Sequence, residues 1–387
     1  MENSKFIPYG RQDITEEDIE EVVKVLHSDF LTQGPAVPLF EQKLCSYTGA
    51  RYSVAVNSCT SALHIACLAL GLVPGDILWT SPITFVASAN CALYCGASVD
   101  FVDIEPDTAL MSVEKLSVKL ELAKERGVLP KIVIPVHFSG QSCDMKEIYA
   151  LSRQYGFKII EDAAHAIGAS YQNELVGNCR YSDITVFSFH PVKIITTGEG
   201  GVAMTNSSQL AEKMKLLRSH GITKDLNKIH EKSNDHWYYE QVELGFNYRM
   251  TDIQAALGIS QLNRLDQYVL RRTEIVEWYD ERFKDVAVDP LIKKSSRTSA
   301  HHLYIVRVKK GSQLRDKLYR SLIDNGIGAN VHYIPVYQQF FFKELFGDKK
   351  CSLAEEYYAK TITLPLNHVI NDSELEFIVN KVIDIVK

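Results

Sequence analysis

Residues 184–205 read ITVFSFHPVKIITTGEGGVAMT, and this stretch indicates how the chain folds. Two apolar runs typical of buried strands, residues 184–189 and Gly201–Thr205, enclose a loop of small and hydroxyl-bearing residues. The loop contains Lys193, although a lysine usually lies on a polar helix face. At a sheet edge the amine can lose hydration, which lowers its pKa and lets it form a Schiff base. Taken alone, however, the segment still favours a structural lysine.

The chain around this segment alternates between strand and helix patterns. Strand patterns precede it at Tyr52–Val56, Ile77–Thr80, Ser98–Asp103, Lys131–His137 and Phe157–Glu161. Helical patterns occur at Thr60–Leu70, Ala87–Tyr94, Met145–Gln154 and Leu210–Ser219. This alternation predicts a mostly parallel sheet covered by helices on both faces, with ligands bound at the carboxyl ends of its strands.

The pattern changes after about Thr251. A long helix from Asp252 to about Phe283 precedes an alternating strand at His302–Val308 and a helix at Gln313–Asn325. A final amphipathic helix follows Asp372. We therefore expect a large domain over residues 1–250 and a smaller α/β domain over residues 251–387.

Composition argues against several classes of partner. The net charge is −6 over 387 residues, so we expect no basic face for nucleic acid or an anionic membrane. The eight cysteines form no C-x-x-C pair and have no histidines at zinc spacing, which predicts buried thiols, no bound metal and a cytoplasmic protein. The uncharged stretch between Asp76 and Asp100 is long enough to span a bilayer, but Pro82 and Gly96 interrupt it and favour burial in the core.

Asp162 and His165 lie in the segment Glu161-Asp162-Ala163-Ala164-His165, directly after an apolar strand. An aspartate there would face the same cleft as Lys193 and could pair with the nitrogen of a pyridine cofactor, although strand-end aspartates also cap helices or bind metals. His165 could stack on such a ring or bond to its phenolic oxygen, or it could be a core histidine.

The segment Asn57-Ser58-Cys59-Thr60-Ser61-Ala62-Leu63 lies where a strand passes into a helix. Free N–H groups and hydroxyls at a helix start bind phosphate, but the same residues also serve as ordinary N-caps. The sequence contains neither G-x-G-x-x-G nor a P-loop motif, which argues against a dinucleotide site and a P-loop kinase.

Together these segments resemble the DegT/DnrJ/EryC/StrS family of sugar aminotransferases over nearly the whole chain. The matching motifs are Tyr9-Gly10-Arg11-Gln12, Leu31-Thr32-Gln33-Gly34-Pro35, Pro82-Ile83-Thr84-Phe85-Val86-Ala87, Glu161–His165, Ser188–Gly201, Arg218-Ser219-His220-Gly221 and Leu244–Asp252. The resemblance implies the pyridoxal-phosphate fold type I, which is aspartate-aminotransferase-like. That fold has a large, mostly parallel α/β/α domain and a smaller C-terminal α/β domain.

The resemblance also assigns roles to residues. Lys193 would hold pyridoxal 5′-phosphate and shuttle the proton, Asp162 would pair with the ring nitrogen, Phe85 would stack on the ring, and His165 would contact its phenolic side. Thr60, Ser61 and Ser188 would bind the phosphate with Asn247 of the partner subunit. Tyr9, Thr32, Arg249, His332 and Tyr333 are expected around the substrate. His190, near the lysine, receives no role.

The segment around Lys193 is most similar to the branch of the family that acts in pseudaminic acid biosynthesis. This similarity implies a homodimer with shared active sites that moves an amino group from L-glutamate to C4 of a UDP-linked 4-keto-6-deoxy-N-acetylhexose. Relatives acting on GDP- or dTDP-linked keto-sugars share most of the pattern and remain alternatives.

Three other readings are weaker. A sister family that dehydrates its sugar carries a histidine where this chain has Lys193. A cysteine desulfurase on the same fold would need a reactive cysteine on a mobile loop, and the sequence offers no good candidate. A non-catalytic cofactor-binding regulator would leave Lys193 and Asp162 without a role.

Overall fold

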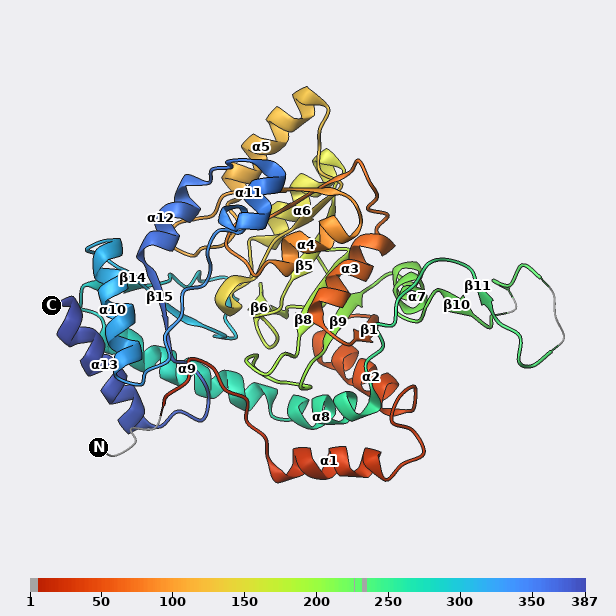
Figure 1. The fold of residues 1–387 in the computed structure, drawn as a ribbon, viewed down its shortest axis with the longest axis horizontal. Helices are drawn as coiled ribbons and strands as arrows, with labels where there is room; N and C mark the ends of the chain where they lie inside the picture. Colours follow the sequence, from red (N-terminus) through yellow and green to blue (C-terminus); the bar gives the residue numbers. More distant parts are fainter. Residues whose placement is uncertain (1–5, 226, 232–234) are drawn as a thin grey trace.

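The computed structural model describes residues 6–225, 227–231 and 235–387. Its centre is a seven-stranded sheet in the order β1-β9-β8-β5-β4-β2-β3 (Figure 1). The strands are β1 (Tyr52–Val56), β2 (Ile77–Thr80), β3 (Ser98–Phe101), β4 (Ile132–Ile134), β5 (Lys158–Asp162), β8 (Ile184–Ser188) and β9 (Gly201–Thr205). Strand β9 is antiparallel to both of its neighbours and the other pairs are parallel, so the prediction of a mostly parallel sheet is confirmed.

Helices cover both faces of the sheet because its strands are apolar on both sides. Helices α3 (Cys59–Ala69), α4 (Ala87–Tyr94) and α7 (Ser208–Leu217) lie over one face, and α2 (Ala36–Thr48) and α8 (Asp252–Leu262) lie over the other. The alternation along β1 shows this arrangement. Val54 and Val56 pack into the cluster that includes α3, whereas Ala55 between them packs with α2.

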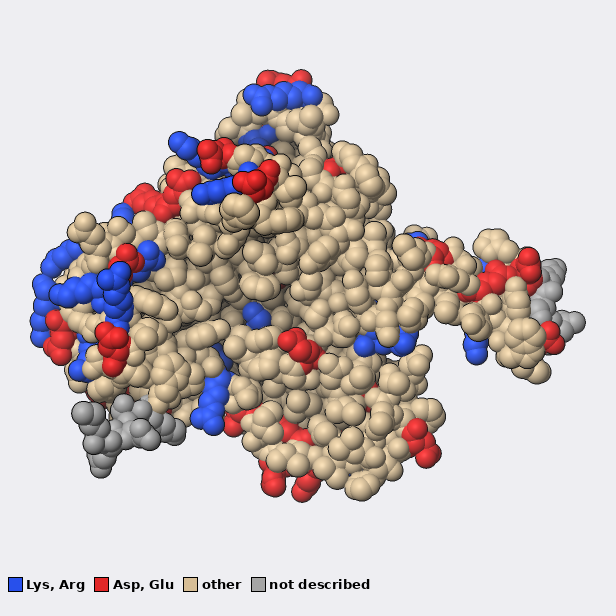
Figure 2. All heavy atoms as spheres, in the orientation of Figure 1, with Lys and Arg blue, Asp and Glu red and all other residues tan. Residues whose placement is uncertain are grey.

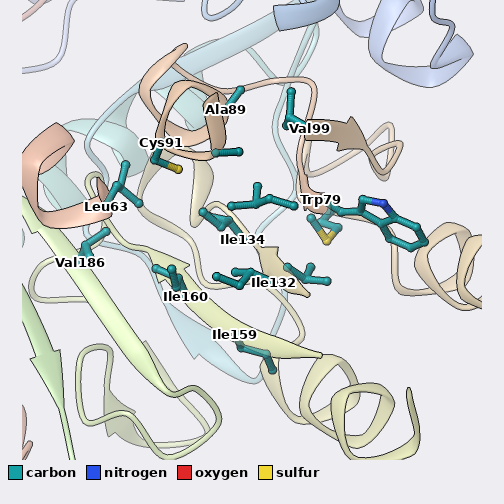
Figure 3. Packing of buried hydrophobic residues seen from close by; sticks show 14 of the residues in the cluster. Leu63, Trp79, Ala89, Cys91, Val99, Ile132, Ile134, Ile159, Ile160 and Val186 are labelled. Carbon is teal, nitrogen blue, oxygen red and sulfur yellow. The ribbon is translucent and has the colours of Figure 1, made fainter. Parts of the chain in front are cut away.

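The core explains the uncharged stretch between Asp76 and Asp100. This stretch forms β2, α4 and β3, and its side chains pack against Ile132 and Ile134 of the central strands (Figure 3). Trp79 is almost completely buried there. Among the described residues, no helix is long and apolar enough to cross a membrane.

The C-terminal part begins with two helices where the sequence predicted one, so the single helix from Asp252 to Phe283 was wrong. Helix α8 ends at Leu262 and α9 (Leu265–Arg282) begins after a break at Arg264, whose backbone leaves the helical conformation. The Arg264 guanidinium bonds to Asp18 at 2.6 Å. This partly buried ion pair holds Arg264 at the break, and local periodicity could not reveal a partner so distant in the chain.

A second, antiparallel sheet of β12 (Val288–Pro290), β14 (Tyr304–Val308) and β15 (Thr361–Leu364) follows, packed with α10 (Ser312–Asp324) and α13 (Asp372–Val386). Ile7, from the start of the chain, lies in this cluster and pairs with Ile327. The described N-terminal segment therefore crosses to the C-terminal part. The domain boundary at residue 250 stays a prediction.

The remaining elements lie around this frame. They are α1 (Glu16–Leu26), α5 (Val113–Arg126), η1 (Phe138–Gly140), α6 (Met145–Tyr155), β6 (Ser170–Tyr171), β7 (Glu174–Leu175), β10 (Ile222–Thr223), β11 (Glu240–Gln241), β13 (Arg297–Thr298), η2 (Val336–Gln338), α11 (Phe340–Phe346) and α12 (Ser352–Lys360). The β10–β11 hairpin projects from the body beyond α7 (Figure 1). On the face shown in Figure 2, charges of both signs gather at the rim, and the centre is largely uncharged.

Asp252 joins the start of α8 to the start of α2. Its carboxylate is buried and accepts the backbone N–H groups of Gly34 at 2.7 Å, Ala36 at 2.8 Å and Val37 at 3.2 Å. Helix α2 has no capping side chain of its own, since its N-cap is Pro35. Asp252 therefore caps a helix that lies more than 200 residues away in the chain.

Replacing Asp252 with Ala should destabilise the protein by about 2–4 kcal/mol, because three N–H groups lose a charged acceptor. Asp266→Ala is the matched control, since this exposed aspartate makes one bond, from the Tyr47 hydroxyl, and should cost less than about 1 kcal/mol. Urea unfolding followed by circular dichroism measures both. Equal losses would show that capping of α2 is not the contribution of Asp252.

Candidate active site

A cleft of about 720 Å³ opens at the carboxyl ends of β5 and β8. Its walls are Tyr9, Asn57, Ser58, Cys59, Thr60, Ser61, Leu63, Thr84, Phe85, Ala87, Ser88, Val136, Asp162, Ala164, His165, Ser188, His190, Val192, Lys193, Glu199, Asn330, His332 and Tyr333. The lining includes every predicted site residue except Thr32, Asn247 and Arg249. A separate hollow of about 340 Å³, between residues 6–14 and 367–374, has a different set of walls.

Lys193 enters the cleft from the loop between β8 and β9. The loop is held because Thr196 and Thr197 both donate to the carbonyl of Phe189, through the hydroxyl and the N–H respectively. Within the part of the chain that the structure describes, the Lys193 amine makes no hydrogen bond. Burial lowers the pKa of this amine to about 8, and the negative charge of Asp162 opposes the shift. The amine is therefore far more nucleophilic near neutral pH than an ordinary lysine.

Asp162 ends β5 and lies in the same cleft. One carboxylate oxygen accepts the Ser88 hydroxyl at 2.6 Å, and the other accepts the Ala164 N–H at 3.1 Å. The backbone carbonyl of Asp162 also accepts the His137 N–H at 2.9 Å. Both the carboxylate and its main chain are thus fixed, while the charge remains in contact with the cleft.

Sequence reasoning missed Ser88, which orients this carboxylate. Ser88 lies in the first turn of α4, three residues after Phe85, which precedes the helix. That spacing was visible in the sequence. Its connection to Asp162 was not, because 74 residues separate the two.

The start of α3 supplies the polar end of the cleft. The hydroxyl of Ser58 accepts the Ser61 N–H at 3.1 Å as N-cap, and the Ser61 hydroxyl donates to Asn57 at 2.7 Å. The capping alternative is therefore correct for Ser58, while the hydroxyls of Thr60 and Ser61 line the cleft. A side chain at Gly201 would lie 2.5 Å from the Cys59 nitrogen, so glycine is required for this helix start to approach β9.

Aromatic rings and histidines form the opposite wall. Phe85 is 60% exposed although it is a large apolar side chain, and its ring centroid lies 6.5 Å from that of Tyr333. The Tyr333 hydroxyl lies 3.4 Å from Nε2 of His165. His332 bonds to the Thr363 hydroxyl at 2.8 Å, and its ring lies 5.5 Å from that of Tyr9.

The histidines of this wall are uncharged. Burial, with the positive charge of Lys193, lowers the pKa of His165 well below its ordinary value. The same two causes lower the pKa of His332 to about 3. Two neutral imidazoles thus face the lysine, and they contribute no charge that would repel a cationic ring.

Thr32, Asn247 and Arg249 do not line this cleft. Arg249 pairs with Val56 at the end of β1, Thr32 pairs with Thr251, and the Asn247 carbonyl accepts the Asn57 side chain at 3.5 Å. Thr32 and Asn247 are exposed and Arg249 is half-buried. A single chain therefore does not bring them to Lys193.

The cleft residues without a predicted role include His190, Glu199 and Asn330. His190 and Glu199 lie at the two ends of the lysine loop, with Nε2 and Oε1 3.9 Å apart. Asn330 reaches the cleft from a segment whose backbone pairs with Thr363. Both loop residues lie in the motif around Lys193, but no sequence signal marks Asn330.

Comparison with known proteins agrees with this geometry. A model of the DegT/DnrJ/EryC1/StrS aminotransferase family matches residues 12–383. The spore coat polysaccharide biosynthesis protein SpsC of Bacillus subtilis is 39% identical over 100% of this chain and 99% of its own. The UDP-4-amino-4,6-dideoxy-N-acetyl-beta-L-altrosamine transaminase of Campylobacter jejuni is 39% identical over 96% of this chain and 95% of its own.

Solved structures match equally well. Helicobacter pylori PseC, an aminotransferase involved in the biosynthesis of pseudoaminic acid, superimposes with a TM-score of 0.90 and 34% identity over 99% of both chains. A Streptococcus pneumoniae structure in its PLP form gives a TM-score of 0.88 with 31% identity over 98% of both chains. These matches confirm the predicted aminotransferase fold. The chain belongs to the DegT/DnrJ/EryC1/StrS aminotransferase family.

Proposed function

We propose that this protein is a pyridoxal-phosphate-dependent nucleotide-sugar aminotransferase. It moves an amino group from L-glutamate to C4 of a UDP-linked 4-keto-6-deoxy-N-acetylhexose, in the cytoplasm and as a homodimer. The observation that carries the proposal is the pair formed by Lys193 and Asp162. A half-buried lysine amine with a lowered pKa and a carboxylate fixed by two donors share one cleft.

The residues of the cleft fit pyridoxal phosphate. Asp162 would hold the ring nitrogen, Phe85 would cover one ring face, and Thr60, Ser61 and Ser188 with the start of α3 would hold the phosphate. Nδ1 of His165 is buried and has no hydrogen-bond partner among the described residues, which fits a ring substituent at this wall. When bound, the cofactor supplies an electron sink for the carbanion formed at the reacting carbon.

The chain's own groups then do the proton work. The Lys193 amine removes a proton from the α-carbon of the donor amino acid, and later delivers one to C4 of the sugar. A pKa of about 8 suits both tasks, because the amine can be neutral in one step and charged in the next. Asp162 would hold the ring nitrogen throughout.

The substrate assignment is supported by what the relatives are named for. The Campylobacter jejuni relative is named as a transaminase of a UDP-linked amino sugar, and the Helicobacter pylori structure belongs to pseudoaminic acid biosynthesis. Both cover almost the whole of this chain. All eight cysteines are unpaired thiols, which fits a reducing compartment.

The position of the arginines supports the proposal that the two subunits share their active sites. Among the described residues, the cleft lining of one chain contains no arginine, although both proposed substrates are anions. Arg249 and Asn247 lie outside the cleft of their own chain, and in the sequence they follow Leu244, which is 77% exposed. A twofold interface at this surface would place two such arginines reciprocally into the neighbouring clefts.

The aminated form of the enzyme, incubated with a panel of UDP-, GDP- and dTDP-linked keto-sugars, should convert the UDP-linked 4-keto-6-deoxy-N-acetylhexose. Bleaching of the cofactor absorbance and the mass of the aminated product measure this. Lys193→Ala should show no turnover and no cofactor fixed to protein by borohydride. Preference for a GDP- or dTDP-sugar would reassign the substrate, and fixation in Lys193→Ala would reassign the lysine.

Asp162→Asn should fold normally and lose roughly 10³-fold or more in kcat, because an amide cannot hold the ring nitrogen protonated. Ser88→Ala keeps the charge and removes one orienting bond, so it should lose only about 10-fold. Stopped-flow measurement of the glutamate half-reaction separates the two. Near-normal turnover in Asp162→Asn would show that this carboxylate is structural.

Mixed dimers test the shared site. Lys193→Ala and Arg249→Ala should each be nearly inactive alone. After subunit exchange in equal amounts, activity should return to about a quarter of wild type, since half the dimers are mixed and each has one complete site. If mass spectrometry confirms exchange and no activity returns, Arg249 serves the cleft of its own chain.

A further inference from the structure

Arg272, on α9, is fully buried and lies outside the cleft lining. Its Nη1 donates to three main-chain carbonyls, those of His301 at 3.2 Å, His302 at 3.4 Å and Leu366 at 3.1 Å. In the described part of the chain no carboxylate lies within ion-pair distance, and burial lowers the pKa of the guanidinium to about 10. A buried charge held by carbonyl dipoles alone is costly, which raises the question of what the arrangement supports.

The carbonyls of His301 and His302 connect Arg272 to the cofactor cleft through the ring of His302. The ring of His302 lies against the ring of His165, with centroids 4.3 Å apart. His165 in turn lines the cleft and contacts the Tyr333 hydroxyl at 3.4 Å. His302 itself does not line the cleft, so it can act only through His165.

The segment around His302 is held from its other side as well. Its N–H donates to the Ser139 carbonyl at 3.0 Å, and the Ser139 hydroxyl donates to the Leu303 carbonyl at 2.7 Å. A side chain at Gly140 would lie 2.8 Å from the His301 nitrogen, so a glycine at φ +103° is needed for this approach. The His302 backbone is therefore clamped between η1 and Arg272.

The carbonyl of Leu366 connects Arg272 to another wall of the cleft, which contains Tyr9. The N–H of Leu366 donates to the carbonyl of Tyr9 at 3.0 Å, and Tyr9 lines the cleft. One guanidinium thus joins α9 to the main chain behind both His165 and Tyr9.

The charge states of His165 and His302 favour the packing of their rings. Burial lowers the pKa of His302 well below its ordinary value, and the neighbouring His165, Lys193, Arg272 and His332 add to the shift. The pKa of His165 is lowered in the same direction by burial, Lys193 and His332. The two imidazoles are therefore neutral and can pack ring against ring without repulsion.

We propose that Arg272 and His302 are positioning residues for the cofactor cleft: Arg272 holds the main chain of His302, and the His302 ring sets the orientation of His165. The inference rests on the proposed function, because it needs His165 to face the cofactor.

The test compares His302→Ala with His302→Phe, which keeps a flat ring, and adds Arg272→Met. His301→Asn and Arg271→Met are matched controls, since His301 faces a different hollow and Arg271 is partly exposed on the same helix. The measurements are the affinity of the apoprotein for pyridoxal phosphate, the cofactor absorbance spectrum, and kcat and KM for glutamate. Thermal unfolding midpoints show whether each variant is folded.

We expect His302→Ala and Arg272→Met to bind pyridoxal phosphate roughly 10–100-fold more weakly and to lose kcat by a similar factor, with KM for glutamate changed less than about threefold. His302→Phe should stay within about threefold of the wild type in cofactor affinity and kcat, and both control variants should show wild-type values within the same limit.

Wild-type affinity for pyridoxal phosphate in His302→Ala, or equal defects in His302→Ala and His302→Phe, would overturn the inference. If Arg272→Met does not fold, the comparison of His302→Ala with His302→Phe tests the inference by itself. Failure of the wild type itself to bind pyridoxal phosphate would instead refute the proposed function.

Discussion

Within the described residues, a half-buried lysine amine without a hydrogen-bond partner, held at the carboxyl ends of β5 and β8, is the constraint on which the site depends. Burial penalises the ammonium form, so the pKa of Lys193 falls to about 8. The loop that carries the amine is held by Thr196 and Thr197, which both donate to the Phe189 carbonyl. The short connection between β8 and β9 is thus both the turn that reverses a strand and the support of the reactive group.

Asp162 balances this amine within the same cleft. Its carboxylate is fixed by Ser88 and the Ala164 N–H and is located where β5 ends. The histidines opposite are neutral because burial and the lysine both disfavour their charged forms. The cleft of one chain thus combines the Lys193 amine, the fixed Asp162 carboxylate and several uncharged polar atoms, with Glu199 and His190 at the ends of the lysine loop. This arrangement suits a flat ring with a nitrogen at one end and a phosphate at the other.

Support for the cleft extends well beyond its lining. Asp252 caps α2 from the start of α8, and Arg272 of α9 binds the main chain behind two cleft walls. Both residues belong to the helices that connect the sheet to the C-terminal part. The geometry around Lys193 is therefore coupled to how the C-terminal part packs against the central sheet. Substitutions far from the cleft can act through these helices as well as through stability alone.

From its local patterns alone, the sequence predicted the strands of the large sheet and the helices α3, α4, α6 and α7, because each carries its own period and its own end signals, but it did not predict α2 or α5. It also indicated Lys193 and Asp162, since both follow apolar strands in motifs that stand out locally. It did not reveal the break between α8 and α9, the bond from Ser88 to Asp162, or the burial of Arg272 against three carbonyls. Each of these depends on residues tens to hundreds of positions apart, and their contacts leave no periodic trace in the chain. Only the tertiary structure decided them, because hydrogen bonding and desolvation depend on distance in space rather than distance in sequence.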